Sequence, residues 1–491
     1  MILLGLIIIP AIAGIISFFV RQSNWRRFIL VLAAIIHTGL TLSLWWFLPV
    51  SFYGGWLMLD NLGLFFLSIT SVLFLCVSIY AVGYFRQETT DKIQDFEEDA
   101  FFTNAPEARF KGCLLLFLSA MSLVCVSGHF GLQWVAIEAT TLASAPLIYY
   151  HRHHRSLEAS WKYLLICSVG IALALMGNFL LVVAGGEVLP LYMQTMIENA
   201  AQISTPWLKA SFIFFLVGYG TKMGLAPLHT WLPDAHSEAP SLVSALLSGT
   251  LLNCSFLGIL RVWQVCVASG NGAFCQELFL VFGLLSMAVA AVFILGQKDY
   301  KRMLAYSSVE HMGILALGMG IGGTAIFGAM LHTLNHSITK AMLFLTAGNI
   351  LRVYKTKSCD EVRGVLRVLP VSGMLWMAGF FAIVGFPPFS IFLSEFTITK
   401  SALDRGMTAV AVIFLALLAI IFIGMSRSFL GMAQGDEPEG IKRKTESFLC
   451  LLPPIVLSIF IILGGVYIPS ALSSLLHEIA GQLGGFLTVI S

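Results

Sequence analysis

Long apolar runs follow one another along almost the whole chain, separated by short polar connections. Each is long enough to cross a bilayer as a helix, which takes about 20 residues. We predict fourteen spans near residues 2–20, 28–48, 61–85, 111–128, 130–150, 159–184, 207–229, 239–263, 275–296, 303–320, 324–351, 370–400, 407–430 and 448–470. Residues 471–491 form a short amphipathic tail that is expected on a surface. The pattern predicts an all-α polytopic membrane protein.

Glycine and proline interrupt two of these runs. The seventh contains GTKMGLAP (220–227), and the twelfth contains GFPPFSIFLSEF (385–396). Proline removes a helix hydrogen bond and glycine permits close backbone approach, so both helices should break there. The interruptions are five helices apart, and a five-helix unit used twice must be inverted in its second copy. We therefore predict two inverted five-helix repeats with broken helices seven and twelve.

The repeats divide the chain into four parts. We expect an N-terminal three-helix segment and loop over 1–110, a first repeat over 111–263, a second over 275–430, and a last helix and tail over 431–491. The first apolar run has no basic region before it and no small-residue cleavage site, so it is expected to be a span and not a removed signal peptide.

Composition supports the membrane assignment. The chain is 58% hydrophobic and 11% charged, against about 25% charged in soluble domains. Its nine cysteines are scattered without a CxxC pair, which argues against zinc, iron–sulfur or nickel ligation. Neither a resident metal or cofactor nor a nucleic-acid partner is expected, and any redox chemistry would belong to another chain.

The basic residues are distributed unevenly between alternate loops. Most of the 28 Lys and Arg residues lie in the loops around 21–27, 86–111, 152–155, 298–302, 352–367 and 427–444. The opposite side holds only Lys209, Arg261, Lys400 and Arg405. Cytoplasmic loops carry such an excess, so both termini are expected on the external or periplasmic side of a bacterial or archaeal cell membrane.

Two ionisable residues of the first repeat lie inside apolar runs. Lys222 falls in the interrupted seventh helix, and Glu138 in GLQWVAIEATTLASAPL of the fifth. A charge at bilayer depth costs on the order of 3 kcal/mol or more and usually marks an ion path. A Glu–Lys pair can change its protonation near neutral pH as water or its partner changes. The bland alternative for Glu138 is a carboxylate satisfied by a neighbouring helix.

The eleventh helix carries three titratable groups on one face. His332, His336 and Lys340 in HTLNHSITKAMLFL are spaced i, i+4, i+8, which aligns them over about 12 Å. Histidine can donate and accept protons near neutral pH, which suits stepwise proton transfer. Metal binding by His332 and His336 is a weaker reading, because no third ligand is evident. Glu395, after the second break, could end a path on the external side.

Several other residues keep two readings open. Glu310 and His311 in the tenth helix could serve as proton input or simply pair with Lys301 or Arg302. The i, i+4 pair Glu158 and Lys162 could be another input or only a helix-stabilising bridge.

The segment after Lys222 contains two histidines and two acids. His229 would share a face with Lys222 if the helix resumes, and His236 follows in the turn; either belongs to the path or only stabilises the turn. Asp234 and Glu238 are expected to be helix caps.

Three strings resemble a known family. KMGLAPLHTWLPDAHSEAPS (222–241), QKDYKRMLAYSSVEHMG (297–313) and FPPFSIFLSEF (386–396) are similar to the antiporter-like proton-translocating subunits of respiratory complex I, Mrp-type sodium/proton antiporters and membrane-bound group 4 nickel–iron hydrogenases. The resemblance covers roughly residues 60–435. It implies the same fourteen-helix fold with two inverted repeats, and it assigns the family's path residues to Glu138, Lys222 and Glu395.

The details SVEHMG and LSEF resemble the hydrogenase branch, such as formate hydrogenlyase and hydrogenase-4-like membrane subunits. One departure is Asn253, where complex I members carry a lysine or histidine. Asparagine cannot hold a proton at neutral pH, so transfer past it would have to use water.

These observations predict a proton-translocating subunit that a redox partner must drive, because no ATP-binding or redox motif is present. The resemblance implies other membrane subunits and a hydrogenase or iron–sulfur peripheral arm, docked through a membrane anchor. The alternatives are an Mrp-type Na⁺/H⁺ antiporter subunit, a complex I (NADH:quinone oxidoreductase) subunit, or a scaffold whose charged residues are vestigial.

Overall fold

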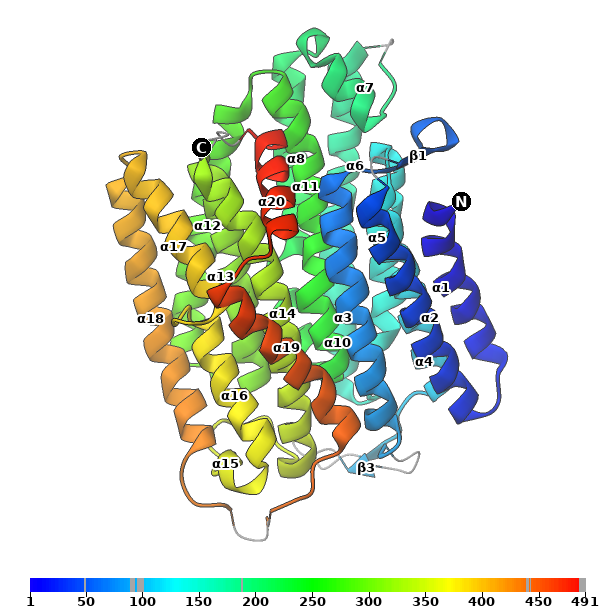
Figure 1. Cartoon of the computed structure of the whole chain (residues 1–491), viewed down its shortest axis with the longest axis vertical. Coiled ribbons are helices and arrows are strands. Elements are labelled where there is room, and N and C mark those ends of the chain that lie inside the picture. The colour runs from blue at the N-terminus through cyan, green and yellow to red at the C-terminus, as the bar shows by residue number, and fades with distance from the viewer. Residues whose placement is uncertain are drawn as a thin grey trace.

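The computed structural model describes residues 1–47, 50–88, 93–94, 101–186, 189–438, 441 and 443–484. Two of the basic loop residues, Lys92 and Lys442, lie outside these ranges, as do residues 485–491 of the tail. Long helices run side by side through the molecule, and the loops gather at the two ends of the bundle (Figure 1). Within the described ranges the strands form only two short antiparallel hairpins: Val50–Phe52 (β1) with Leu57–Leu59 (β2), and Ile93–Gln94 (β3) with Phe101–Phe102 (β4). The all-α prediction is confirmed.

The first eleven helices account for the N-terminal segment and the first predicted repeat. They are α1 (Ile2–Phe19), α2 (Ser23–Ser43), α3 (Asn61–Phe85), α4 (Glu107–Val126), α5 (Phe130–Ile148), α6 (His154–Gly185), α7 (Met193–Glu198), α8 (Thr205–Met223), α9 (Trp231–Glu238), α10 (Ser241–Leu246) and α11 (Leu252–Ala268). A π-helical segment, Leu247–Leu251, joins α10 to α11. Helix α7 is a short connection between α6 and α8.

The remaining helices account for the second predicted repeat and the end of the chain. They are α12 (Gly272–Leu295), α13 (Tyr300–Ile321), α14 (Thr324–Tyr354), α15 (Val365–Val368), α16 (Pro370–Ile383), α17 (Ser390–Asp404), α18 (Thr408–Ala433), α19 (Phe448–Val466) and α20 (Ser470–Gln482). Each of the fourteen predicted spans coincides with one of these helices or with a broken pair.

Both predicted breaks are present. Helix α8 ends at Met223, where Gly224 takes a left-handed conformation (φ 89°), and the chain becomes helical again only at Trp231. The predicted seventh span, 207–229, was therefore too long at its end. Helix α16 stops at Ile383, Gly385 has φ 66°, and α17 begins at Ser390. In each set of five spans the broken one is the fourth, as two inverted copies require; the exact domain boundaries stay a prediction.

Five of the fourteen spans are shorter or less apolar than the others. In the described part of the chain, nine helices are long and apolar enough to cross a membrane: α1, α2 with the turn after it, α3, α4, α6, α10 continuing into α11, α12, α18 and α19. The spans that miss this criterion are α5, α8, α13, α14 and the α16–α17 pair. Each of these five carries at least one of the candidate path residues or inputs singled out above: Glu138, Lys222, Glu310, His332 and Glu395.

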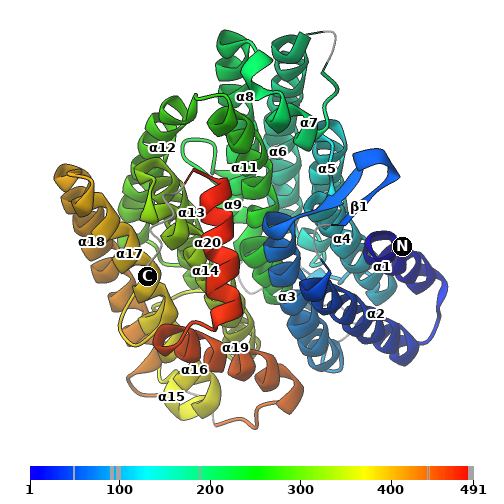
Figure 2. The same ribbon diagram turned by 45° about the horizontal axis from the view of Figure 1, so that its top comes forward.

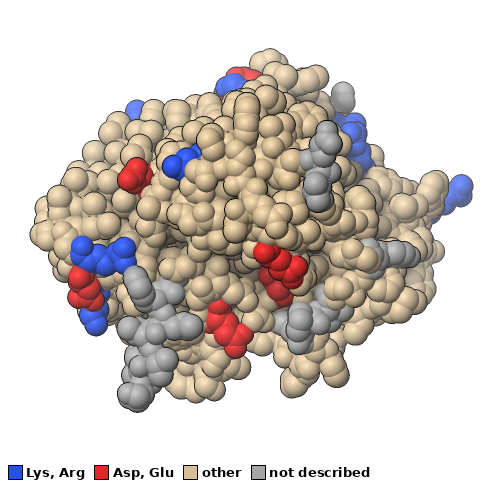
Figure 3. All heavy atoms as spheres, turned by 90° about the horizontal axis from the view of Figure 1, so that it is seen from above, with Lys and Arg blue, Asp and Glu red and all other residues tan. Residues whose placement is uncertain are grey.

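The two ends of the bundle differ in charge. Figure 3 looks onto the end that carries α7 and β1, and only a few scattered Lys and Arg side chains are visible there. The N-terminus and α20 both lie toward this end (Figure 1). Helix α20 packs beside α14 and α3 (Figure 2). It buries Leu475, Leu476 and Ile479 and exposes His477 and Glu478, as an amphipathic surface helix should.

Close backbone contact holds α8 against α6. A Cβ atom added at Gly218 of α8 would lie 2.6 Å from the backbone nitrogen of Ala174 and the carbonyl oxygen of Gly170 in α6. Small residues allow such approach in membrane helices. This contact fixes the position of the helix whose last turn carries Lys222.

Candidate functional site

Lys222 lies in the last turn of α8 and is fully buried. Its Nζ donates to the carbonyl oxygen of Ile137 (2.5 Å), to Thr140 Oγ1 (2.8 Å) and to Thr141 Oγ1. All three acceptors belong to α5. An ammonium has three protons to donate, so α5 accepts all three of its hydrogen bonds while leaving its charge unneutralised.

Glu138 lies on α5 beside this cluster but faces outward. It is half-buried, and its carboxylate accepts from Thr141 Oγ1 (3.2 Å) and from Ser168 Oγ of α6 (3.2 Å). Its α5 neighbours Val135 and Leu142 are 51% and 62% exposed. The predicted carboxylate inside the bundle is thus a carboxylate at its lateral face. In the described chain no direct ion pair joins it to Lys222; Thr141 bridges the two.

The two histidines after the break point to different places. His229 lies in the link between α8 and α9, with its ring near Phe293 and Tyr306 (centroids 6.4 and 6.3 Å away). The helix does not resume there, so the condition for a face shared with Lys222 is not met. His236 is fully buried in α9 and stacks on Phe344 of α14 (5.1 Å).

The acids expected to be caps make ion pairs instead. Asp234 pairs with Lys162 of α6 and Arg302 of α13, both at 3.0 Å. Glu238 pairs with Lys357 at 2.7 Å. Burial raises the pKa of Glu238, but the charge of Lys357 outweighs it and holds the pKa below its ordinary value.

The pair Glu158–Lys162 forms at 2.7 Å with both side chains about half exposed (51% and 46%). Lys162 also reaches Asp234, so its contacts tie α6 to α9 at the surface. The geometry agrees with a stabilising bridge and does not bring either residue to Lys222.

The α14 stripe is buried along its whole length. His332, His336 and Lys340 are each 0% exposed. Lys340 Nζ donates to the carbonyl oxygen of Leu304 in α13 (2.6 Å). His336 places its ring 5.1 Å from that of His311, and its two nitrogens have no hydrogen-bond partner among the described residues.

Glu310 and His311 of α13 belong to this buried cluster and not to the surface pairs. Lys301 donates instead to the carbonyl oxygens of Ser237 (2.9 Å) and Ala239 (2.6 Å), and Arg302 pairs with Asp234. The alternative pairing with Lys301 or Arg302 is therefore wrong. Glu310 is 2% exposed and interacts electrostatically with Lys340.

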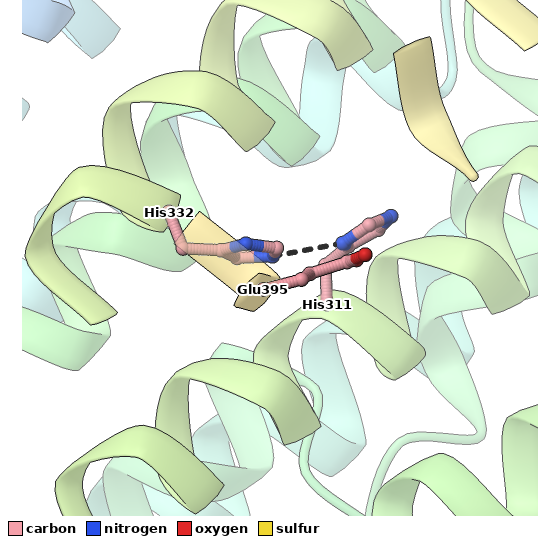
Figure 4. A group of neighbouring side chains, drawn as sticks. All are labelled: His311, His332 and Glu395. Atoms are coloured by element: carbon pink, nitrogen blue, oxygen red, sulfur yellow. Dashed lines mark hydrogen bonds between the residues drawn. The ribbon is translucent and has the colours of Figure 1, made fainter. Parts of the chain in front are cut away.

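Glu395 completes the cluster from α17. A ring nitrogen of His311, a ring nitrogen of His332 and a Glu395 carboxylate oxygen all lie within 4.8 Å of one another (Figure 4). His311 Nδ1 and His332 Nε2 are 2.9 Å apart. These side chains come from three helices, so their spacing in the sequence gave no sign that they meet.

Asn253 links the two halves. Its Nδ2 donates to Ser337 Oγ of α14 (2.7 Å) and to the carbonyl oxygen of Gly249 (2.9 Å). Ser248 and Ser308 make a second contact between the halves at 2.8 Å. The sequence did not single out the hydroxyl groups of Ser337, Ser248, Ser308, Thr140 and Thr141. The one sign of them in the sequence is that each is a polar residue inside an apolar run.

Comparisons with known proteins agree with this fold. The chain is 35% identical over 423 residues to the hydrogenase-4 component F homolog of Methylacidiphilum infernorum, covering 85% of this chain and 86% of that one. It is 27% identical over 405 residues to hydrogenase-4 component B of Escherichia coli, covering 80% of this chain but only 57% of that longer protein. A subunit of the archaeal membrane-bound sulfane sulfur reductase has the same fold, with a TM-score of 0.86, 21% identity and 98% of both chains covered.

Residues 127–421 match the model of the NADH:quinone oxidoreductase/Mrp antiporter transmembrane family. This segment contains all twelve candidate path and input residues, from Glu138 to Glu395. The helices, the two breaks and this match agree. The chain therefore belongs to the NADH:quinone oxidoreductase/Mrp antiporter family of multi-pass membrane proteins.

Proposed function

We propose that this chain translocates protons as a membrane subunit of a redox-driven complex of the nickel–iron hydrogenase type. One observation carries the proposal: a completely buried ammonium, Lys222, is joined through Thr141 to Glu138. A charged side chain that is kept inside a bilayer usually belongs to a path along which ions or protons move. Relatives named as hydrogenase-4 components support the choice of complex.

The contacts suggest how the first half works. With Glu138 ionised, its negative charge stabilises the Lys222 ammonium at a distance through Thr141. Protonating Glu138 removes that stabilisation, so the lysine more readily releases its proton toward the second half. The Asn253–Ser337 contact lies between the halves, and since Asn253 cannot hold a proton, water must carry the proton past it.

The second half offers a continuous set of acceptors. His236 stacks on Phe344 of α14. The His311 ring of α13 lies between those of His336 and His332 of α14, with ring centroids 5.1 and 5.0 Å away, and Glu395 of α17 lies at the end of the series. Glu310 and Lys340 supply opposite charges beside it. Neutral histidine donates with one nitrogen and accepts with the other, which suits proton transfer through this cluster.

The driving energy has to come from a partner. Moving a proton against 100 mV takes about 2.3 kcal/mol, and the sequence contains no motif for ATP or an electron carrier. We propose that other membrane subunits cover the outward-facing Glu138, and that a hydrogenase and iron–sulfur arm docks through a membrane anchor on the basic side. The basic loops then face the cytoplasm of a bacterial or archaeal cell, and both termini face outside.

The test is proton translocation by the purified complex in sealed vesicles, followed with a pH-sensitive dye after electron donor is added. We expect Lys222→Met and Glu138→Gln to abolish translocation while the complex still assembles. Lys209→Met is the matched control, because Lys209 lies on the same helix but contacts Phe274 away from the cluster. Normal translocation in both Lys222→Met and Glu138→Gln would refute the path.

The family also includes Mrp antiporters, so sodium/proton exchange is the second candidate. It requires no electron donor. Sodium-dependent proton flux in vesicles without donor would favour exchange, whereas flux only during electron transfer supports the redox-driven subunit.

A further inference from the structure

His311, His332 and Glu395 form a compact set of donor atoms inside the second half. The three residues come from α13, α14 and α17, and they are 0%, 0% and 6% exposed. One atom from each lies within 4.8 Å of the other two (Figure 4). Two imidazoles and one carboxylate are the ligand set of many zinc sites that keep a fourth position open.

The hydrogen bonds define which ring nitrogen of His332 carries the proton and which presents a lone pair. Ser394 Oγ donates its single proton to the carbonyl oxygen of Ile391 (2.7 Å), so it must accept from His332 Nδ1 (2.9 Å). A neutral His332 therefore presents a bare Nε2 lone pair toward His311. Metal-bound histidines commonly donate their other nitrogen to an oxygen in this way, which orients the ring.

His311 can supply a second nitrogen without losing its proton altogether. Its Nδ1 lies 2.9 Å from His332 Nε2, while its Nε2 has no hydrogen-bond partner among the described residues. If a metal binds Nδ1, the proton moves to Nε2. The nitrogen separation is close to the value of about 3.3 Å that follows from tetrahedral Zn–N bonds of about 2.0 Å.

Glu395 brings the negative charge that a cation needs. Its Oε1 is buried without a partner in the described structure, and the carboxylate lies directly against the backbone of Gly385, where a Cβ atom would fall 2.0 Å from Oε2. Glu310 interacts electrostatically with Glu395. An ionised Glu395 carboxylate offsets part of the charge of a bound divalent ion, and a buried ion needs such compensation.

We propose that His311, His332 and Glu395 bind a divalent transition metal such as Zn²⁺, and that the bound ion inhibits the protein. The metal would occupy the nitrogens between which a proton would otherwise pass. Binding the metal does not depend on the proposed function. Inhibition does depend on it, because the ion must block proton transfer.

The metal site differs from the pair that helical spacing suggested. His332 and His336 are four residues apart on α14, but Glu395 lies close to His332 and His311 and not to the pair that spacing suggested. His336 therefore provides a matched control: it is equally buried, lies one turn away on the same helix and contacts His311 with its ring.

The experiment titrates Zn²⁺ into the detergent-purified complex against a chromophoric chelator. We expect His311→Gln, His332→Gln and Glu395→Gln each to weaken Zn²⁺ binding at least tenfold, and Ser394→Ala to weaken it by about 10-fold or more. His336→Gln should bind as tightly as the wild type. X-ray absorption of the unmutated protein with one equivalent of Zn²⁺ should show two imidazole ligands and oxygen, which tests the site without any substitution.

Three outcomes would overturn the site: unchanged affinity in all three ligand variants, an equal loss in His336→Gln, or an absorption spectrum without imidazole. Proton translocation is measured in parallel with and without Zn²⁺. Zinc bound at this site with no inhibition would keep the site and refute the inhibition, and would count against the proposed proton path through it.

Discussion

Lys222 and Glu138 share the hydroxyl group of Thr141, which accepts from the ammonium and donates to the carboxylate over 3.2 Å. The two charged residues therefore interact without direct contact. Such an arrangement allows one group to sense the charge of the other while each remains free to exchange its proton. Thr141 becomes the residue on which the coupling depends.

Thr141→Val removes this hydroxyl while keeping the shape of the side chain. The ammonium loses one hydrogen bond, worth about 1.5–3 kcal/mol for a charged group, but keeps the acceptors Ile137 and Thr140. We expect the complex to assemble and proton translocation to fall at least several-fold. Thr141→Ser, which restores a hydroxyl, should recover most of it. If the valine variant pumps like the wild type, the bridge has no role in translocation.

Asn253→Leu tests the connection between the two halves. It removes the donor to Ser337 at 2.7 Å, a bond whose loss alters stability by only about 1 kcal/mol. We expect assembly to survive and donor-driven proton translocation to drop. The control is Asn178→Leu, a buried asparagine of α6 that donates to the carbonyl oxygen of Ala174 in its own helix and takes no part in the contact between the halves. An equal effect of both substitutions would indicate a packing defect and not a broken link.

The ion pair between Asp60, beside β2, and Arg261 of α11 should stabilise the fold in a pH-dependent way. Arg261 donates to both carboxylate oxygens, at 2.6 and 2.7 Å. Burial raises the pKa of Asp60, but the charge and hydrogen bonds of Arg261 outweigh it and leave the pKa below its ordinary value. The stabilisation is therefore complete above the unfolded-state pKa of about 3.9 and is lost as the pH falls through the lower folded-state pKa.

Asp60→Asn leaves a buried, unpaired guanidinium and should reduce the unfolding free energy by about 3–5 kcal/mol near neutral pH. Thermal unfolding in detergent, followed by tryptophan fluorescence, should show the wild type and variant converging below about pH 4. The surface pair Arg367–Asp436 is the control, since Asp436 is 93% exposed and such pairs contribute about 0–1 kcal/mol. A constant difference between wild type and Asp60→Asn at all pH values would contradict the assignment.

Gly218→Ala should separate α8 from α6. The new Cβ would lie 2.6 Å from backbone atoms of α6, and overpacking of this kind typically costs about 1–3 kcal/mol. We expect a lower unfolding temperature and, because α8 carries Lys222, reduced translocation. Gly39→Ala of α2 is the control, since a Cβ atom there meets nothing within 4 Å. Equal stability of the two variants would show that α6 and α8 can relax apart without penalty.

The sequence alone predicted the fourteen spans, both breaks and the burial of Lys222 and the α14 stripe. These properties are local. A span depends on the partition of about 20 consecutive residues between water and lipid, and a break depends on glycine and proline within a few positions. The same local reasoning failed at the end of α8, because the chain does not return to a helix until Trp231.

Only the tertiary structure decided which side chains meet. Helical spacing grouped His332 with His336, whereas the rotation and packing of α13 and α17 bring His311 and Glu395 to His332. Helix packing likewise brings Asp234 and Glu238, expected to be caps, into ion pairs with Arg302 and Lys357. It also places Glu138 on the outer face of the bundle. Spacing along one helix defines its faces, but the partner of each face depends on how all the helices pack together, and that is a property of the whole chain.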